Sequence, residues 1–487
     1  MPSDKFIRQL RQEAEQWQSE GLITTSVYEQ LAQRYQFSNI ETAARNRFVM
    51  ILIGLGSLLL GLAIITLIAA NWQTWSRELK GTLLLGLFVG VNTAGFYLWR
   101  HPTTGWQRRL GQGLLLLGAL ILGANMAVMS QLFHQSGLLY QLFLFWGLGV
   151  LAMAYSLRFT WLGILAILLI GSGYGQSLSE FTSIGEFFGL QLLVQYMPVL
   201  AGLMFIPLAY WCCSSWLFRL GAIAVVYSLE ASLIQLGLVN STAWIAAIAC
   251  ALPPALLWAY SDSLWAKHLL PVKSFNRLAR TLAVCFLSLL FYILSFHWVW
   301  KTSPLPTGEN ISPLPGFVLI NLLVLGSLTI WEWLRLFLQL REGWRKRKQK
   351  EEGVVNLYPV GGLLTNSMVG IMIITSALVP YWHLSISSLS VVGVLLFNLL
   401  LFLLTAGLVR EGWLQGQRRL FWGGMMLLSL QIFSRMLEYN TDLLFKSLIL
   451  FLCGGSVIAA GLWFERYMLA SEGSPKRSNG TEASTNE

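Results

Sequence analysis

Long apolar runs separated by short polar segments make up most of this chain. Residues 1–47 and 467–487 are polar, and apolar runs of about 20 residues follow one another between them. A helix of that length spans the hydrocarbon core of a bilayer, where helices satisfy every backbone hydrogen bond internally. The pattern predicts an all-α, polytopic membrane bundle of about fourteen spans, at 48–70, 79–99, 110–132, 138–157, 159–175, 193–211, 217–236, 241–260, 279–300, 316–338, 360–382, 389–409, 420–437 and 445–464.

The positions of Lys and Arg predict how the bundle is oriented. With residues 1–47 inside the cell, 28 of the 33 Lys and Arg residues fall on the cytoplasmic side. Basic residues concentrate in cytoplasmic loops, so we predict that both termini are cytoplasmic and that the number of spans is even. The loops around Arg158 and Arg219 hold one cation each, and twelve spans, with one pair fewer between residues 138 and 240, also fit this pattern.

Composition agrees with this class and excludes several others. Apolar types make up 55% of the chain, charged types 11% and mean hydropathy is +0.60, whereas soluble domains carry about 25% charged residues. A secreted disulfide scaffold, a collagen and a soluble enzyme with one anchor are therefore excluded. The net charge of +10 lies in loops and not on a soluble basic face, so we expect a lipid bilayer and no nucleic acid as the partner.

Residues 1–47 predict a small cytoplasmic module of two helices. Apolar residues recur at helical spacing, Gly21 interrupts them, and Thr24 or Thr25 can cap a second helix. The apolar positions of the first helix are Phe6, Leu10, Ala14 and Trp17. Residues 1–46 would either dock a cytoplasmic protein partner or help membrane insertion. The transmembrane bundle would occupy residues 48–466, and residues 467–487 would form a disordered cytoplasmic tail.

Glu230 is the first candidate site residue, because ionisable groups in the hydrocarbon are costly and mark functional sites. It lies eleven residues beyond Arg219, which is about 16 Å along a helix and close to the midplane. In one interpretation this carboxyl binds a proton, a cation or a substrate amine. In the other it is a neutral acid that forms hydrogen bonds between helices.

A polar stripe near the C-terminal end gives the second candidate site. Its residues are spaced by three or four and share one helical face if the helix continues: Gln431, Arg435, Glu438, Asp442 and Lys446. Arg435 and Glu438 could bind an anionic or zwitterionic ligand at the outer interface, since a guanidinium offers a planar fork. Alternatively, the stripe is an internally neutralised helix end, which the spacing favours.

A basic cluster follows the span at 316–338. It consists of Arg341, Arg345, Lys346, Arg347 and Lys348, in a loop that we place at 341–352. Such a cluster fixes membrane topology, and it could also contact anionic lipid headgroups.

The remaining patterns offer little catalytic chemistry. The segment 171–176 is rich in glycine and predicts a flexible or broken helix end. His134, His297 and His383 fall on the outer side, but no two share a helix at ligand spacing, so we expect no metal site and no cofactor. HExxH, Walker, Rossmann and GxSxG motifs are missing from the sequence. We therefore assign no catalytic residues.

Several residues resemble a known family. Trp17-x3-Gly21-Leu-Ile-Thr, then Arg47, then Leu67-Ile-Ala-Ala-Asn-Trp72 and Lys80 are similar to the bacterial membrane-protein family called domain of unknown function 2157. The distal segments Gln431-Ile-Phe-Ser-Arg435, Lys446-Ser and Phe464-Glu-Arg466 resemble the end of long cyanobacterial-type members. The likeness is strongest over residues 5–130. It implies a polytopic inner-membrane protein with a cytoplasmic N-terminal module, and it implies no activity.

Three functions remain after these observations. The first is a transporter of a small molecule, an ion or a lipid, for which two inverted halves would be typical. The second is a non-catalytic scaffold or assembly factor that acts through the N-terminal module. The third is a membrane-embedded transferase, although the outer loops 176–192 and 301–315 are short. A transporter predicts a cavity that leads to Glu230, and a scaffold predicts that this carboxyl is sealed among side chains.

Overall fold

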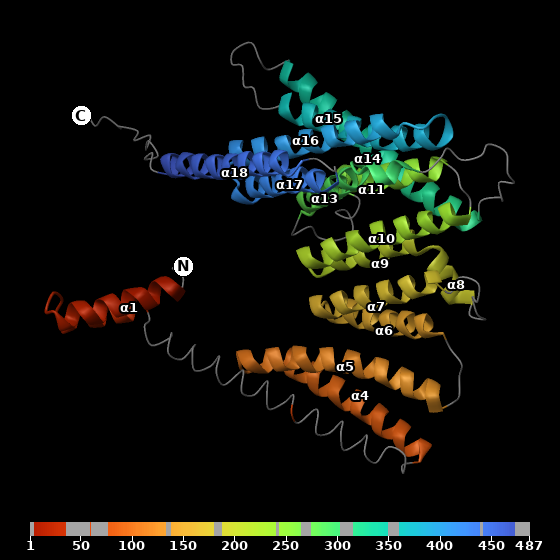
Figure 1. Cartoon of the computed structure of the whole chain (residues 1–487). Coiled ribbons are helices and arrows are strands. Elements are labelled where there is room, and N and C mark those ends of the chain that lie inside the picture. The colour runs from red at the N-terminus through yellow and green to blue at the C-terminus, as the bar shows by residue number, and fades with distance from the viewer. Residues whose placement is uncertain are drawn as a thin grey trace, which may run out of the picture. The chain divides into compact units, whose positions relative to one another are not determined.

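The computed structural model describes residues 4–35, 59, 76–132, 138–179, 188–239, 243–263, 274–301, 315–348, 360–438 and 442–472 (Figure 1). These ranges contain helices and turns but no strand, which confirms the predicted all-α class. The helices are α1 (Asp4–Ser19), α2 (Thr25–Tyr35), α4 (Arg77–Arg100), α5 (Gly105–Leu132), α6 (Leu139–Leu157), α7 (Thr160–Ser179), α8 (Phe188–Gln195), α9 (Met197–Trp211), α10 (Ser215–Val239), α11 (Ala243–Ala259), α13 (Asn276–Leu294), η2 (His297–Lys301), α14 (Gly316–Lys348), α15 (Val360–Ser385), α16 (Ser390–Leu414), α17 (Arg418–Glu438) and α18 (Leu443–Glu472).

Most of these helices are long and apolar enough to cross a membrane. Eleven meet this condition alone: α4, α5, α6, α7, α10, α13, α14, α15, α16, α17 and α18. The bent pair α8–α9 adds a twelfth span, and α11 is a shorter apolar helix of 17 residues. Each predicted span from 79–99 onward therefore has a helical counterpart. The first one, 48–70, lies outside the described residues, and the total count and the orientation stay predictions.

The chain divides into two compact units, Met1–Gly90 and Val91–Glu487. In the first unit α1 and α2 contact each other, Ala14 is fully buried, and Tyr28 donates a hydrogen bond to Glu15 at 3.4 Å. The turn between the two helices contains Gly21, whose φ of +75° is available to glycine at no steric cost. The predicted boundary at residue 47 lies outside the described residues.

The second unit has an aromatic and aliphatic core at the centre of its helices. The largest buried cluster joins residues of α6, α7, α9, α10, α11, α13 and α16. Its largest fully buried side chains include Phe205, Phe218, Phe275, Phe291 and Phe397. The rings of Phe218 and Phe275 are stacked with centroids 4.8 Å apart. Helices in lipid associate through such packing and not through hydrophobic burial alone.

Small residues allow the helices to approach closely. The Trp146 indole of α6 donates a hydrogen bond to the Ala119 carbonyl of α5 at 2.7 Å, and a methyl group at Gly123 would overlap the same indole. The small residues Ala119 and Gly123 on this face of α5 therefore let the Trp146 ring of α6 lie against the backbone of α5. Gly147 of α6 leaves similar room for Ile170 of α7, and these two helices lie side by side (Figure 1).

The expected helix break at 171–176 is wrong. The segment 171–176 lies inside α7, because Gly173 packs against Leu144 and the helix continues to Ser179. The break occurs instead in the predicted span 193–211, where α8 and α9 meet at an angle of 87° at Tyr196. Pro198 at the start of α9 suits a new helix, because proline is well tolerated in the first turn.

Candidate functional site

An apolar cavity lies between four helices of the second unit. Its volume is about 660 Å³, and α9, α10, α11 and α14 form its walls. The lining residues are Val199, Gly202, Leu203, Ile206, Phe218, Ala222, Val225, Val226, Leu256, Leu257, Tyr260, Val324, Leu325, Ser327, Leu328 and Trp331. Leu203 of α9 and Trp331 of α14 are 55% and 59% exposed among the described residues. The cavity is therefore accessible from the side of the bundle, between α9 and α14.

Tyr260 lies at one end of this cavity. Its contacts show which residues of α9, α10 and α11 lie at the same level along the bundle. The Tyr260 hydroxyl lies 2.7 Å from that of Tyr210 at the end of α9, and the Tyr260 ring centroid lies 5.2 Å from that of Phe218 in α10. Twelve residues separate Tyr210 from Pro198, and twelve separate Phe218 from Glu230. At 1.5 Å per residue both intervals are about 18 Å. Glu230 therefore lies at the depth where α9 begins.

Glu230 stands at the opposite end of the cavity from these tyrosines. The cavity-lining residues Ala222 and Val226 precede it by two turns and one turn on the same face of α10. Its Oε1 atom is buried and has no hydrogen-bond partner among the described residues. The Cys250 thiol of α11 lies near it. The structure thus places an unpartnered carboxyl oxygen just beyond the last turn of α10 that lines the cavity.

Asn321 adds a second polar group at this end. It lies one turn before the cavity residue Leu325 on α14 and is only 2% exposed. Its Nδ2 atom donates a hydrogen bond of 2.8 Å to the carbonyl of Gln195, the last residue of α8. The Oδ1 atom is buried without a hydrogen-bond partner among the described residues. This amide therefore fastens α14 to the break between α8 and α9.

α11 is a continuous helix, but its backbone hydrogen bonding is incomplete at Pro254. Pro254 has no N–H group, so the Cys250 carbonyl loses its normal helical donor. The Ser376 hydroxyl of α15 lies 3.4 Å from that carbonyl and donates to it. Irregular backbone in a membrane is tolerated where protein groups satisfy it. Two of the four helices around the cavity, α9 and α11, thus depart from regular helical hydrogen bonding near the depth of Glu230.

A hydrogen-bonded cluster closes the tyrosine end. Tyr210 donates a hydrogen bond of 2.5 Å to Asp262, so the Tyr260 hydroxyl donates to Tyr210 in turn. Asp262 also accepts hydrogen bonds from the Ser274 hydroxyl and from the backbone N–H groups of Phe275 and Asn276. The carboxylate therefore caps the start of α13 and links it to α9 and α11.

These contacts change the proton affinity of Asp262. Burial raises its pKa, but the hydrogen bonds from Ser274, Tyr210, Phe275 and Asn276 lower it by more, so the net pKa lies below 3.8. A carboxyl with a lowered pKa stabilises the fold above its unfolded-state pKa, and that stabilisation is lost as the pH falls through the folded-state value.

We expect this lost stabilisation to be visible in the pH dependence of unfolding. The wild-type protein should lose stability below pH 3.8 through protonation of Asp262, whereas Asp262→Asn should lack this component. Asn removes the charge and replaces one acceptor oxygen by an NH2 group that cannot accept, so this variant should also be less stable than wild type at pH 7, and the comparison uses the shape of the two pH curves. Thermal unfolding between pH 3 and pH 7 measures both proteins. Parallel curves throughout this range would show that the charge has no such role.

The second candidate site from the sequence is divided by the fold. Gln431, Arg435 and Glu438 lie on α17, which ends at Glu438, whereas Asp442 directly precedes α18. The helix does not continue through the five positions, so the expectation of one shared face is wrong. Glu230 is on α10, and the ion pair of Arg435 is with Glu438. The two candidate sites are therefore not joined by an ion pair in the described part of the chain.

Arg435 binds other groups of the protein through its Nη1 atom, whereas its Nε and Nη2 atoms are buried without a hydrogen-bond partner among the described residues. Its Nη1 atom donates to the Ser295 carbonyl at 2.6 Å and pairs with Glu438, which also accepts the His297 N–H at 2.6 Å. The guanidinium carbon lies 4.0 Å from the centroid of the Phe296 ring. Gln431 donates to the Asn398 carbonyl at 2.9 Å. The bonds of Arg435 and Glu438 connect α17 to the end of α13 and the start of η2, and the bond of Gln431 connects α17 to α16.

The basic cluster lies on a helix and not in a loop. α14 continues to Lys348, so it carries all five predicted lipid-contact residues: Arg341, Arg345, Lys346, Arg347 and Lys348. The predicted loop 341–352 is thus partly helical. Arg341 is exposed, and the side chains of the other four lie outside the described residues. Their contact with anionic lipid stays a prediction.

The histidines have structural neighbours. The Nδ1 atom of His383 accepts the Leu389 N–H at 2.9 Å, and its ring meets that of Trp300 edge-on at 5.0 Å. His134 lies outside the described residues. No group of three His, Cys, Asp or Glu side chains within the described ranges could hold a metal ion.

Sequence reasoning found Glu230 and missed the polar groups at both ends of the cavity. Asp262 follows the predicted span 241–260, and a carboxyl next to a span has no unusual spacing. Asn321 is a polar residue within an apolar span, and the sequence therefore contains a signal for it. An uncharged amide is less conspicuous than an acid. The Tyr210–Tyr260 contact joins residues 50 positions apart, and no local sequence pattern predicts it.

The fold and the cavity define a class: a multi-pass helical membrane protein with an interrupted span beside a lateral cavity. Residues 15–163 match the family model described as Predicted membrane protein (DUF2157). This match confirms the resemblance indicated by the sequence over that range, which contains α2, α4, α5 and α6. It ends before Glu230 and before the cavity. No curated protein and no solved structure matches the chain.

Proposed function

We propose that the protein is a carrier for an amphipathic cation in a bacterial inner membrane. The cavity that ends near Glu230 is the observation that supports this function. Its volume of about 660 Å³ lies within the range of about 300–1,000 Å³ found for small-molecule sites. The apolar part of the solute would occupy the cavity, and its positive charge would approach the Glu230 carboxyl.

The interrupted span α8–α9 supports transport over simple binding. Substrate sites of secondary transporters lie near the midplane and use discontinuous helices. The break between α8 and α9 lies at the depth of Glu230, and Asn321 connects that break to α14. Movement of α8 and α14 together would change access to the carboxyl without unfolding a span.

The mouth of the cavity provides a test of this function. Ser327 is an exposed lining residue of α14, so Ser327→Phe fills the cavity without crowding the core. We expect this variant to reduce ethidium flux into proteoliposomes about tenfold or more, measured by fluorescence on encapsulated DNA, because the solute loses its apolar contacts. Leu323→Phe is the control, since Leu323 is 61% exposed on the same helix and does not line the cavity. Equal flux through wild type and Ser327→Phe would contradict the proposal, as would no flux through wild type.

A scaffold function is the second candidate, supported by the N-terminal hairpin. Leu22 is 69% exposed between α1 and α2, and Val27 on α2 is 42% exposed. A scaffold would use these side chains as part of an apolar patch that docks a partner. This function predicts that Leu22→Glu with Val27→Glu removes the biological activity of the protein in cells while Ser327→Phe preserves it. The carrier function predicts the reverse.

A further inference from the structure

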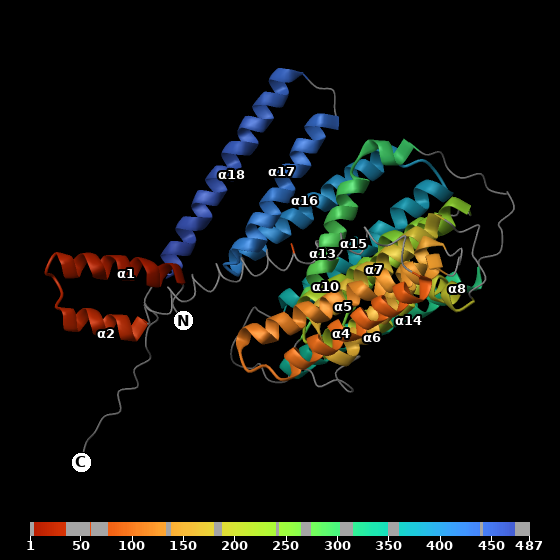
Figure 2. The same cartoon turned by 90° about the horizontal axis from the view of Figure 1, so that it is seen from below.

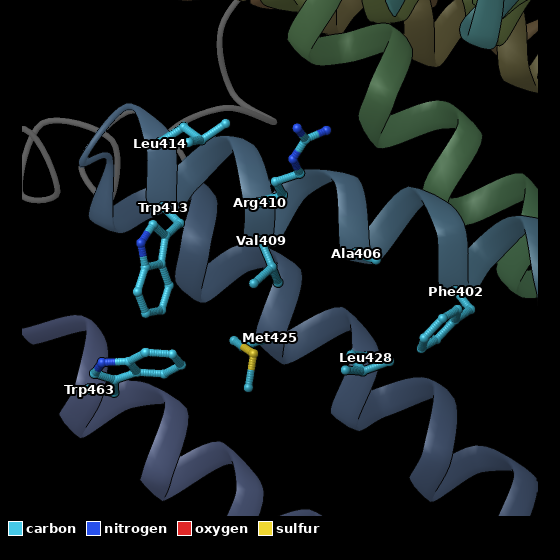
Figure 3. Close-up of a pocket in the computed structure, with 9 residues that line it drawn as sticks. All are labelled: Phe402, Ala406, Val409, Arg410, Trp413, Leu414, Met425, Leu428 and Trp463. Atoms are coloured by element: carbon cyan, nitrogen blue, oxygen red, sulfur yellow. The ribbon is translucent and has the colours of Figure 1, made fainter. Parts of the chain in front are cut away.

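A second apolar hollow lies between α16, α17 and α18, away from the cavity near Glu230. Its volume is about 480 Å³ (Figure 3). It is lined by Phe402, Ala406, Val409, Arg410, Trp413, Leu414, Met425, Leu428 and Trp463. Six of these residues recur at helical spacing on α16, so the hollow is a groove along one face of that helix.

The groove has one aromatic end and one basic residue beside it. Trp413 and Trp463 face each other there with ring centroids 4.9 Å apart, and Met425 lies next to them (Figure 3). Trp413 is in the last turn of α16, at the end that carries Arg418 and Arg419 and that the sequence places on the cytoplasmic side. Tryptophan is enriched at the level of lipid headgroups. This end of the groove therefore lies at the inner interface.

Arg410 is free to bind an anion at that interface. Its side chain is exposed, and it forms no ion pair with a described residue. Arg418 at the same end is already paired with Glu465 at 3.0 Å. Arg410 borders the groove, and its side chain extends from α16 away from Trp413, Met425 and Trp463 (Figure 3). An arginine in this position covers apolar surface and presents its charge to water and headgroups.

The helix beside the groove, α18, has an exposed apolar surface. None of the 18-residue apolar window of α18 is buried among the described residues, and Phe451 and Leu462 are 78% and 62% exposed. α18 packs on α17 through its C-terminal half, where Phe421 and Phe464 stack at 4.1 Å. The rest of α18 extends beside α17 without a buried side chain (Figure 2). An acyl chain can therefore enter the groove directly from the bilayer.

We propose that this groove binds one anionic phospholipid of the inner leaflet. One acyl chain lies along α16 between Phe402 and Met425, and the phosphate meets the Arg410 guanidinium. A guanidinium binds phosphate through paired, charge-assisted hydrogen bonds, which favours an anionic lipid over a zwitterionic one. The site is separate from the basic end of α14 and does not depend on the proposed transport function.

Thermal unfolding in nanodiscs tests the site. We expect phosphatidylglycerol to raise the unfolding midpoint of wild type above its value in pure phosphatidylcholine, by mass action. Arg410→Gln should need about tenfold more phosphatidylglycerol for the same shift. Arg419→Gln is the matched control, because Arg419 is exposed at the same end but does not line the groove. It should respond like wild type.

Further variants and ligands distinguish a bound lipid from other occupants of the groove. Ala406→Trp fills the groove at an exposed position and should abolish the shift, while inorganic phosphate alone should stabilise no variant. Equal responses of wild type and Arg410→Gln would overturn the proposal, and so would equal effects of the two lipids. Stabilisation by free phosphate would overturn it in favour of a soluble anion. A dimer in detergent that Ala406→Trp dissociates would overturn it in favour of a second copy of the chain.

Discussion

Arg435→Met is expected to lower the free energy of unfolding by about 3–5 kcal/mol, which is the usual cost of breaking a buried ion pair. The side chains of Arg435 and Glu438 are only 12% and 15% exposed. Removing the cation would leave the Glu438 carboxylate buried without its partner, and the Ser295 carbonyl would lose a donor. Chemical unfolding in mild detergent measures the loss.

The chain offers a matched control for this prediction. Arg418 and Glu465 form an ion pair of 3.0 Å whose side chains are 55% and 40% exposed. Because exposed pairs are worth about 0–1 kcal/mol, Arg418→Met should be nearly neutral. The double variant Arg435→Met with Glu438→Met should recover most of the loss, since no unpaired charge stays buried. If Arg435→Met were as stable as wild type, the arginine would be a ligand site and not a structural residue.

Glu230→Gln is expected to abolish most binding of amphipathic cations without loss of stability. The substitution preserves the shape of the side chain and removes the negative charge that we place beyond the cavity. Ethidium affinity should fall about tenfold or more, equivalent to about 1.4 kcal/mol or more. The unfolding midpoint should stay equal or rise, because a buried group without a hydrogen-bond partner costs free energy when it is charged.

Two readouts together distinguish the roles of Glu230. Fluorescence titration gives the affinity, and thermal unfolding without ligand gives the stability. A carboxyl that only holds helices together would produce a destabilised variant with unchanged affinity. A carboxyl that binds the cation would produce a variant with unchanged stability and reduced affinity.

The helices could be predicted from sequence because lipid leaves the backbone few alternatives. The apolar run 389–409 corresponds to α16, which begins at Ser390 and continues five residues further to Leu414, since any other backbone would have unsatisfied polar groups in the membrane. The same reasoning assumed that each run is straight. It therefore missed the break at Tyr196, where the apolar residues continue on both sides and Pro198 is the main local signal.

From the sequence, a residue of the candidate site could be predicted only where its type is strongly disfavoured in a membrane span. Glu230 is conspicuous because a carboxylate in an apolar span is costly, whereas the cavity beside it depends on how four helices pack. The glycine-rich segment 171–176 shows the converse. Its composition predicts a break, but the packing of Gly173 against Leu144 preserves the helix, and no local pattern contains that contact.

The most direct test of the central claim compares two ions of the same shape and opposite charge. Thermal unfolding of wild type and Glu230→Gln would be measured in nanodiscs with tetraphenylphosphonium and with tetraphenylborate. We predict that the phosphonium cation raises the midpoint of wild type with increasing concentration, and that the borate anion does not. Glu230→Gln should lose the response to the cation. Equal stabilisation by both ions, or an unchanged response of the variant, would contradict a cation-binding role for Glu230.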